Sequence, residues 1–246
     1  MAHLLNVPAN EPALMVGAVH KSYGNVHPLN NVEFSVAAGA FFGLVGVNGA
    51  GKTTLIKCLL DAIRPDSGEI RIFGESSRQT RSRRQLAFLP ERFSAPYYVT
   101  GLEFLDLMNR LYRVCTTSEA VDAAARSLDL DLDALRRPVR SYSKGMTQKL
   151  GLAACLLSER PLLVLDEPAS GLDPKARALL KVALGALRAK GTTVFLTSHA
   201  LADVEEICDF MAVLHGGALR YVGTPEGLRT VTGQHSLESA FLATIE

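Results

Sequence analysis

The sequence has few cysteines and almost no net charge. It contains 26 lysines and arginines against 25 aspartates and glutamates, a balance that argues against a nucleic-acid-binding protein, which usually carries a large basic excess. The basic run at 78–84 could meet anionic lipids or an acidic partner loop, but near-neutral overall charge favours a solvated loop. None of the four cysteines belongs to a CxxC pair, and three have apolar neighbours: Cys58, Cys155 and Cys208. We therefore expect buried free thiols in a reducing compartment.

Long hydrophobic runs are also missing. The sequence has no stretch of about 18 consecutive apolar residues, so we expect no membrane-spanning helix. The N-terminal segment MAHLLNVPANEP lacks the basic start and the apolar stretch of a signal peptide. These absences predict a cytoplasmic chain that would reach a membrane only through a partner protein.

The sequence is long and apolar enough for one domain with a complete core, having 246 residues of which 48% are hydrophobic. We expect strands at 13–23, 32–47 and 68–74, with Gly24 and Gly39 as breaks, and helices at 53–63, 176–190 and from 200 onward. The apolar runs LLVL at 162–165 and VFL at 194–196 are too continuous for half-exposed strands. Such runs are typical of a parallel sheet that is covered on both faces, so the predicted fold class is α/β.

A helical segment interrupts this α/β pattern. Between residues 100 and 157 the apolar residues follow helical spacing. The pairs Thr100/Glu103 and Thr116/Glu119 match the S/T-x-x-E box with which a helix begins. The predicted division of a single domain over 1–246 is an α/β core at 13–95 and 158–222, a helical subdomain at 96–157 and a tail at 223–246.

The segment GVNGAGKTT fits the phosphate-loop pattern G-x-x-x-x-G-K-[ST] and lies between an expected strand and an expected helix. Gly49 and Gly51 would let the backbone curl so that its amides face phosphate groups. Lys52 would neutralise the β- and γ-phosphate charge, and the Thr53 hydroxyl would bind Mg²⁺. A glycine-rich turn that binds nothing is the weaker alternative. The residues expected to contact the nucleotide are Gly46, Asn48, Gly49, Ala50, Gly51, Lys52, Thr53 and Thr54.

Two further strand ends carry candidate catalytic groups. LLVLDEP ends a buried strand in two carboxylates, at the sheet edge where α/β proteins bind ligands. Asp166 would hold Mg²⁺ and Glu167 would act as general base on an attacking water, although such a pair alone is more often a solvated turn. LTSH ends the next strand, so His199 would reach the γ-phosphate, while a helix-capping role for Ser198 or His199 stays open.

We expect a second phosphate-binding loop at SYSKGMTQKL, a polar loop before a helix whose first backbone amides point outward. With it, the ordered motifs GVNGAGKT, YSKGMTQKL, LLVLDEP, SGLD and LTSH resemble those of ATP-binding subunits of ABC transporters over nearly the whole chain. The resemblance implies a P-loop NTPase core with a mostly parallel sheet, an N-terminal antiparallel β portion and an inserted helical subdomain. It also implies that two subunits enclose two Mg-ATP molecules, the signature loop of one facing the phosphate loop of the other.

The resemblance assigns roles to four more residues. Tyr23 matches the aromatic residue that stacks on adenine, with packing on the core as its alternative. Ser143 and Gly145 match the signature residues that meet the γ-phosphate of ATP held by the other subunit. Asp173 in SGLD matches the loop through which the two subunits communicate.

Three residues depart from the common pattern of that family. In the signature, Lys144 replaces a glycine and Met146 replaces a glutamine. Glu91 stands where a glutamine commonly senses Mg²⁺ and the attacking water. A glutamate can still bind a cation or accept a hydrogen bond from water, so we retain Glu91 as a metal-site residue.

We therefore expect an ATPase that forms a homodimer, or pairs with another ATP-binding subunit, and drives transport through a separate integral membrane permease. It would be peripheral on the inner face of the cell membrane. Export is favoured because the signature variants resemble exporter-like subunits and the tail is short for a regulatory domain. A soluble ABC-type ATPase is the alternative, disfavoured by the single nucleotide domain and the lack of heptads. Glu167 with His199 argues against a non-hydrolysing module, and a small-molecule kinase would leave the signature loop unexplained.

Overall fold

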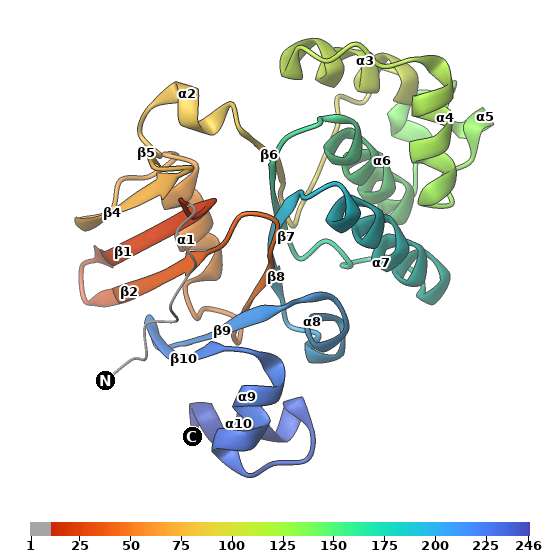
Figure 1. Cartoon of the computed structure of the whole chain (residues 1–246). Helices are drawn as coiled ribbons and strands as arrows, with labels where there is room; N and C mark the ends of the chain where they lie inside the picture. The colour runs from red at the N-terminus through yellow and green to blue at the C-terminus, as the bar shows by residue number, and fades with distance from the viewer. Residues whose placement is uncertain (1–10) are drawn as a thin grey trace.

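The computed structural model describes residues 11–246, which form two β-sheets with helices packed around them (Figure 1). Within this described range, no helix combines the length and the apolar character needed to cross a membrane. The signal-peptide expectation falls on residues that lie almost entirely outside that range. Cys58, Cys155 and Cys208 are free and buried, as predicted, whereas Cys115 is free and exposed.

A six-stranded sheet forms the centre of the fold, with the order β10–β9–β3–β8–β7–β6. Its strands are β3 (Phe41–Val45), β6 (Leu86–Leu89), β7 (Leu162–Asp166), β8 (Thr193–Ser198), β9 (Phe210–His215) and β10 (Ala218–Gly223). All neighbouring pairs are parallel except β9 and β10. Every residue of β7 and β8 is buried, because both faces of the sheet are covered. The predicted parallel sheet is confirmed.

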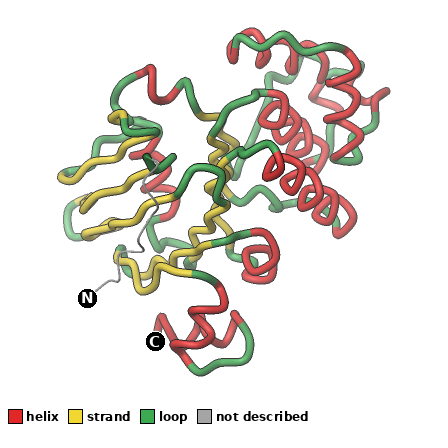
Figure 2. The backbone as a smooth tube through the Cα atoms, in the orientation of Figure 1, coloured by secondary structure: helices red, strands yellow, loops and turns green. Residues whose placement is uncertain are grey.

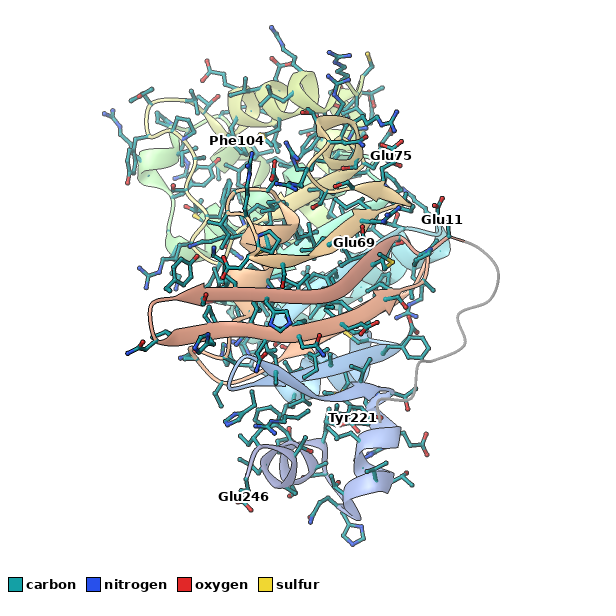
Figure 3. The ribbon with its side chains drawn as sticks, turned by 90° about the vertical axis from the view of Figure 1, so that its left-hand side faces the viewer. Glu11, Glu69, Glu75, Phe104, Tyr221 and Glu246 are labelled. Carbon is teal, nitrogen blue, oxygen red and sulfur yellow. The ribbon has the colours of Figure 1, made fainter. Side chains whose placement is uncertain are left out.

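A four-stranded antiparallel sheet, with the order β2–β1–β4–β5, packs beside the central sheet. Its strands are β1 (Leu14–Tyr23), β2 (Val26–Val36), β4 (Ser67–Ile72) and β5 (Glu75–Ser76). Figure 3 turns this sheet toward the viewer, with Glu69 and Glu75 marking β4 and β5. Helix α1 (Lys52–Leu59) buries Leu55 and Leu59 in a core cluster shared with both sheets, so the helix that follows the phosphate loop is held from two sides.

The strand segment expected over 32–47, with Gly39 as a break, contributes strands to two different sheets. β2 ends at Val36, a turn follows, and β3 begins at Phe41. The Ala40 N–H closes the turn by donating to the Ala37 carbonyl at 3.1 Å, and Gly39 takes a left-handed φ of 78° that favours glycine. The burial patterns of the two strands differ accordingly: β2 mixes exposed with buried residues, whereas every residue of β3 is buried.

Helices occupy most of the segment between β6 and β7, coloured green to teal in Figure 1. They are α3 (Gly101–Tyr112), α4 (Ser118–Ser127), α5 (Leu132–Leu135), the 3₁₀ turn η1 (Val139–Ser141) and α6 (Lys144–Leu157). α4 and α6 pack on each other, as do α3 and α6. We refer to residues 96–157 as the helical subdomain, and these bounds remain a proposal.

The two predicted capping boxes have different outcomes. The Thr100 hydroxyl accepts from the Glu103 N–H at 3.2 Å, and the Glu103 carboxylate accepts from the Thr100 N–H at 2.7 Å, so the first box is confirmed. The second is wrong by one residue, because Thr117 caps α4 and accepts from the Ala120 N–H at 3.2 Å. The side-chain amide of Asn109 instead donates to the Thr116 hydroxyl.

The remaining helices, drawn in red in Figure 2, are α2 (Thr80–Arg83), α7 (Pro174–Ala189), α8 (Leu201–Ile207), α9 (Pro225–Thr232) and α10 (Leu237–Ile245). They lie in three places: α7 and α8 pack on the same face of the central sheet as α6, α2 lies beside β4, and α9 and α10 pack by β10 at the C-terminal end. Alternate residues of β3 face opposite clusters: Phe41 packs with α6–α8 and Phe42 with α1. The tail after β10 forms α9 and α10, and Leu237 and Phe241 bury it against the core.

Candidate active site

A cleft of about 540 Å³ opens between the phosphate loop and the carboxyl ends of β7 and β8. The predicted residues that line it are Asn48, Gly49, Ala50, Gly51, Lys52, Thr53, Thr54, Glu91, Asp166, Glu167 and His199. Pro28 and Val47 complete the lining. Parallel strands bring their carboxyl ends to one edge of a sheet, which is why motifs more than a hundred residues apart meet here.

Close backbone packing shapes the phosphate loop. Gly49 and Gly51 have φ values of 83° and 112°, in the region that favours glycine. A Cβ on Gly51 would lie 2.1 Å from the Pro28 carbonyl oxygen, and one on Gly46 would lie 2.4 Å from the Leu214 carbonyl oxygen. The loop therefore lies tightly between β2 and β9. Space requires a glycine at positions 46 and 51, and the left-handed φ requires one at Gly51 as well.

Lys52 begins α1 and folds back over the loop. Its Nζ donates to the Gly46 carbonyl at 2.5 Å and to the Val47 carbonyl at 3.3 Å. Burial lowers the pKa of the Lys52 amine, and nearby carboxylates, Glu167 foremost, oppose that shift. The ammonium group is thus held among oxygen atoms at the base of the cleft, where an anionic ligand would meet a cation that is already in place.

Asp166 ends β7 and is almost fully buried. Burial raises the pKa of its carboxyl, a hydrogen bond from Thr197 opposes the shift, and the carboxylates of Glu91 and Glu167 add to it. This crowding of acidic groups favours a bound cation. Within residues 11–246, no three acidic, histidine or cysteine side chains gather closely enough to hold a metal, so a cation here would also need ligand oxygens from a bound molecule.

Glu167 lies in a turn that non-glycine residues seldom adopt, with φ 49°. Its N–H donates to the Thr197 hydroxyl at 3.0 Å. Its Oε2 lies 2.8 Å from His199 Nδ1 and 3.4 Å from the His199 backbone nitrogen. The carboxylate is therefore aimed along the end of β8 rather than into solvent, as a general base would need to be.

His199 does not cap the helix that follows it. The N-cap of α8 is Ala200, and no side chain caps that helix end. The His199 side chain is 67% exposed and contacts Glu167. Of the alternatives left open by the sequence, helix capping by His199 is wrong, and contact with a phosphate stays a prediction.

Gly46, at the start of the phosphate loop, does not line the cleft although it was predicted to contact the nucleotide. Four predicted residues outside that loop do not line it either: Tyr23, Ser143, Gly145 and Asp173. Tyr23 is 53% exposed at the end of β1, so it is not packed in the core. Ser143 caps α6 and accepts from the Met146 N–H at 3.2 Å, while Asp173 caps α7 and accepts from the Ala176 N–H at 2.9 Å. Within one chain, these residues therefore do not share the cleft with Lys52.

The signature loop and the SGLD loop pack against each other in the same chain. A Cβ on Gly145 would lie 3.2 Å from the Gly171 carbonyl oxygen, and one on Gly171 would lie 3.1 Å from Lys144 Cε. The side chain of Lys144, which departs from the common signature, therefore runs beside Gly171. Of the other two departures, Met146 packs partly buried against the core, and Glu91 lines the cleft.

Sequence reasoning missed Thr197 as a functional residue. It lies inside the quoted motif LTSH but was given no role. Its hydroxyl bonds to both Asp166 and Glu167, and its side chain is fully buried. The signal is the pairing of Asp166 with Thr197 across β7 and β8, which requires the register of the sheet.

The chain matches the family model described as ABC transporter over residues 29–170. It is 38% identical over 206 residues to an uncharacterized ABC transporter ATP-binding protein from Nostoc sp., an alignment that covers 81% of this chain and 61% of that protein. It is 36% identical over 230 residues to the Nod factor export ATP-binding protein I of Rhizobium meliloti, covering 90% of this chain and 68% of that protein.

A solved structure of an ATP binding subunit of an ABC transporter superposes on the fold with a TM-score of 0.86. The two chains are 31% identical, and the superposition covers 94% of this chain and 99% of the other. The predicted fold class is therefore confirmed. The chain spans less than two thirds of the length of the Nostoc relative.

Proposed function

This chain belongs to the family of ABC transporter ATP-binding proteins, and from that premise we propose that it binds and hydrolyses Mg-ATP to drive export through a separate membrane permease. The observation that carries the proposal is the meeting of the phosphate loop, Asp166, Glu167 and His199 at one cleft. The name of the Rhizobium relative, which refers to export, supports the direction.

Nucleotide binding would rest on the phosphate loop. Its backbone amides and the N-terminus of α1 would face the phosphates, and Lys52 would exchange its carbonyl partners for phosphate oxygens. Thr53, Asp166 and Glu91 would share Mg²⁺ with those oxygens. The metal, when bound, neutralises charge that builds up on the phosphates during transfer.

Hydrolysis would depend on Glu167. Its carboxylate would take a proton from the water that attacks the γ-phosphate, and the His199 side chain at 2.8 Å would keep it aligned while contacting the same phosphate. Glu167 is buried, with 9% of its surface exposed, and this restricts the orientations of its carboxylate, which lowers the cost of reaching a productive geometry.

A second subunit would complete each site. Ser143 and Gly145 stand at the start of α6 and do not line the cleft of their own phosphate loop, so an ATP molecule that contacts both loops would require two chains. Asp173 would lie near the same interface because its loop packs against the signature loop. Tyr23, half exposed, would stack on adenine. The resulting assembly is a homodimer or a pair with a related subunit.

The permease would dock on the helical subdomain, which would make the chain peripheral on the inner face of the cell membrane. Large apolar side chains are exposed there: Tyr97 by 67%, Tyr98 by 85% and Leu111 by 67%. Exposed apolar groups of this size commonly mark an interaction surface. Beside Leu111 lies a groove of about 560 Å³ whose cationic lining residues are Arg83, Arg84, Arg113 and Arg160. The basic run at 78–84 thus contributes to a structured groove, not only to a solvated loop.

The test measures ATP hydrolysis by the purified chain and the recovery of a membrane protein bound to it. We expect the purified chain to release phosphate from Mg-ATP, and a tagged full chain to recover an integral membrane protein from detergent-solubilised membranes of its own host. Leu111→Asp should reduce that recovery, whereas Val231→Asp, at an exposed site in α9, should not. A chain without ATP turnover would contradict the enzymatic part. Turnover with recovery of only a soluble partner would contradict the transport part.

A further inference from the structure

We propose that Thr197 is a positioning residue for ATP hydrolysis, because its single hydroxyl orients both carboxylates at the base of the cleft. This inference rests on the proposed function and assigns a role to a residue outside the phosphate loop and the signature. Thr197 itself does not line the cleft. It acts through Asp166 and Glu167, which do.

The sheet register brings these groups together. Thr197 on β8 pairs with Asp166 on the parallel strand β7, and paired residues on parallel strands project from the same face of a sheet. The Thr197 Oγ1 lies 2.5 Å from Asp166 Oδ1 and 3.0 Å from the Glu167 backbone nitrogen. Its relative exposure is 0%, so water does not compete for either bond.

The direction of each hydrogen bond follows from the donors available. A backbone N–H can only donate, so the Thr197 oxygen accepts from Glu167. The hydroxyl has one proton, which is therefore free to go to the Asp166 carboxylate. This bond occupies Oδ1 and leaves Oδ2 of Asp166 for the cation, so the hydroxyl fixes the rotation of the carboxylate about its own axis.

The bond to the Glu167 N–H has a separate consequence. Glu167 takes the left-handed conformation at φ 49°, which is costly for a residue with a side chain. The hydrogen bond anchors the peptide that makes this turn, and the turn places Oε2 at 2.8 Å from His199 Nδ1. Without the hydroxyl, the N–H would be buried and unpaired, and the turn would lose its anchor.

A buried threonine can also serve packing alone, and two substitutions separate these roles. Thr197→Val keeps the shape and removes the hydroxyl, whereas Thr197→Ser keeps the hydroxyl and removes the methyl group. If Thr197 served packing alone, Thr197→Ser would lower turnover more than Thr197→Val. If its hydroxyl positions the carboxylates, Thr197→Val would lower turnover more. Thr193→Val is the matched control: Thr193 is buried on the same strand and accepts from the Gly39 N–H at 2.9 Å, at the end remote from the cleft.

The experiment measures turnover, ATP affinity and thermal unfolding on the purified full chain. We expect Thr197→Val to lower kcat by about 10- to 100-fold with KM for ATP changed less than about threefold, as for other residues that orient metal ligands. Calorimetry should show that ATP affinity without Mg²⁺ is retained, while the gain in affinity on adding Mg²⁺ shrinks. Thr197→Ser and Thr193→Val should stay within about threefold of the wild type in kcat.

Several results would overturn the inference. Wild-type kcat in Thr197→Val, or an equal loss in Thr193→Val, would show that the hydroxyl does not orient the carboxylates. Should Thr197→Val fail to fold, Thr197→Cys asks the same question, because a thiol of similar size is a weak donor and a weak acceptor. An active wild type with an unaffected Thr197 variant refutes this inference alone, whereas an inactive wild type refutes the proposed function and this inference with it.

Discussion

The two loops that the sequence predicted for phosphate binding differ in how the fold supports them. In the phosphate-loop cleft, Lys52 and Asp166 are buried and hydrogen-bonded, and Gly51 is pressed against the Pro28 carbonyl. In the signature loop, Ser143 and Lys144 are exposed, and the Ser143 hydroxyl contacts only its own helix among the contacts in the described chain. One region is held rigid by buried polar contacts, and the other presents its groups outward.

This difference accounts for the departure at Lys144 in the signature loop. A buried polar group must keep its partners, because an unpaired one destabilises the fold by about 1–3 kcal/mol. The phosphate loop matches its pattern fully under this constraint. At the exposed signature, Lys144 replaces a glycine without disturbing the core, and its side chain finds room along Gly171. The comparison predicts that damage to the cleft acts within one chain, and damage to the signature acts across two.

Glu167→Gln should have the largest effect. The amide cannot accept the proton of the attacking water, so turnover should fall by about 10²- to 10⁴-fold while ATP binding remains. The variant should accumulate as an ATP-bound dimer, measured by light scattering after size exclusion with Mg-ATP. If it stays monomeric with ATP bound, the two-chain site is wrong; if it turns over normally, the base is another residue.

Lys52→Ala should have the next largest effect, on binding. Loss of the charged partner of the phosphates should weaken ATP affinity by about 10- to 100-fold, the range for hydrogen bonds to charged groups. Calorimetry measures this affinity directly. Lys57→Ala is the matched control, because Lys57 is an exposed lysine on the same helix. Equal affinities for the two variants would contradict the phosphate-loop assignment.

Ser143→Arg should impair turnover while ATP binding to a single chain stays normal. A bulky cation in place of the hydroxyl should block closure of the dimer, lowering turnover by about tenfold or more. Ser141→Arg, two residues earlier and also exposed, should have little effect.

Mixing Ser143→Arg chains with Lys52→Ala chains sharpens the comparison further. One site of the mixed dimer then combines an intact phosphate loop with an intact signature. Partial recovery of turnover would establish a site made from two chains. Full activity of Ser143→Arg by itself would show that the signature loop is not part of the site.

Glu91→Gln should have the smallest effect. Glu91 lines the cleft but is exposed, and a glutamine oxygen can replace a carboxylate as a weak cation ligand. Turnover should change by less than about tenfold, with a shifted Mg²⁺ requirement, measured by titrating the metal at saturating ATP. Complete loss of turnover in a folded variant would mean that the Glu91 carboxylate is itself catalytic.

Much of the fold was predictable because its signals are local. The phosphate-loop pattern, the apolar runs of β7 and β8 and the capping box at Thr100 each depend on neighbouring residues alone. Local signals did not predict the correct helix start where two adjacent residues were both suitable as the N-cap. Thr116 and Thr117 both fit a helix N-cap. Thr117 is the cap in the structure, and Thr116 instead accepts a hydrogen bond from Asn109 on the preceding helix.

The sequence by itself determined the chemistry of the cleft: which residues are cationic, which are acidic, and which glycines allow the backbone to turn. Tertiary structure decided which of them meet. The role of Thr197 depends on its register opposite Asp166, and a shift of one residue would turn its hydroxyl to the other face of the sheet. The separation of Ser143 from Lys52 likewise follows from how the helical subdomain sits on the core. Such contacts join distant segments, so their geometry is set by packing that local patterns do not encode.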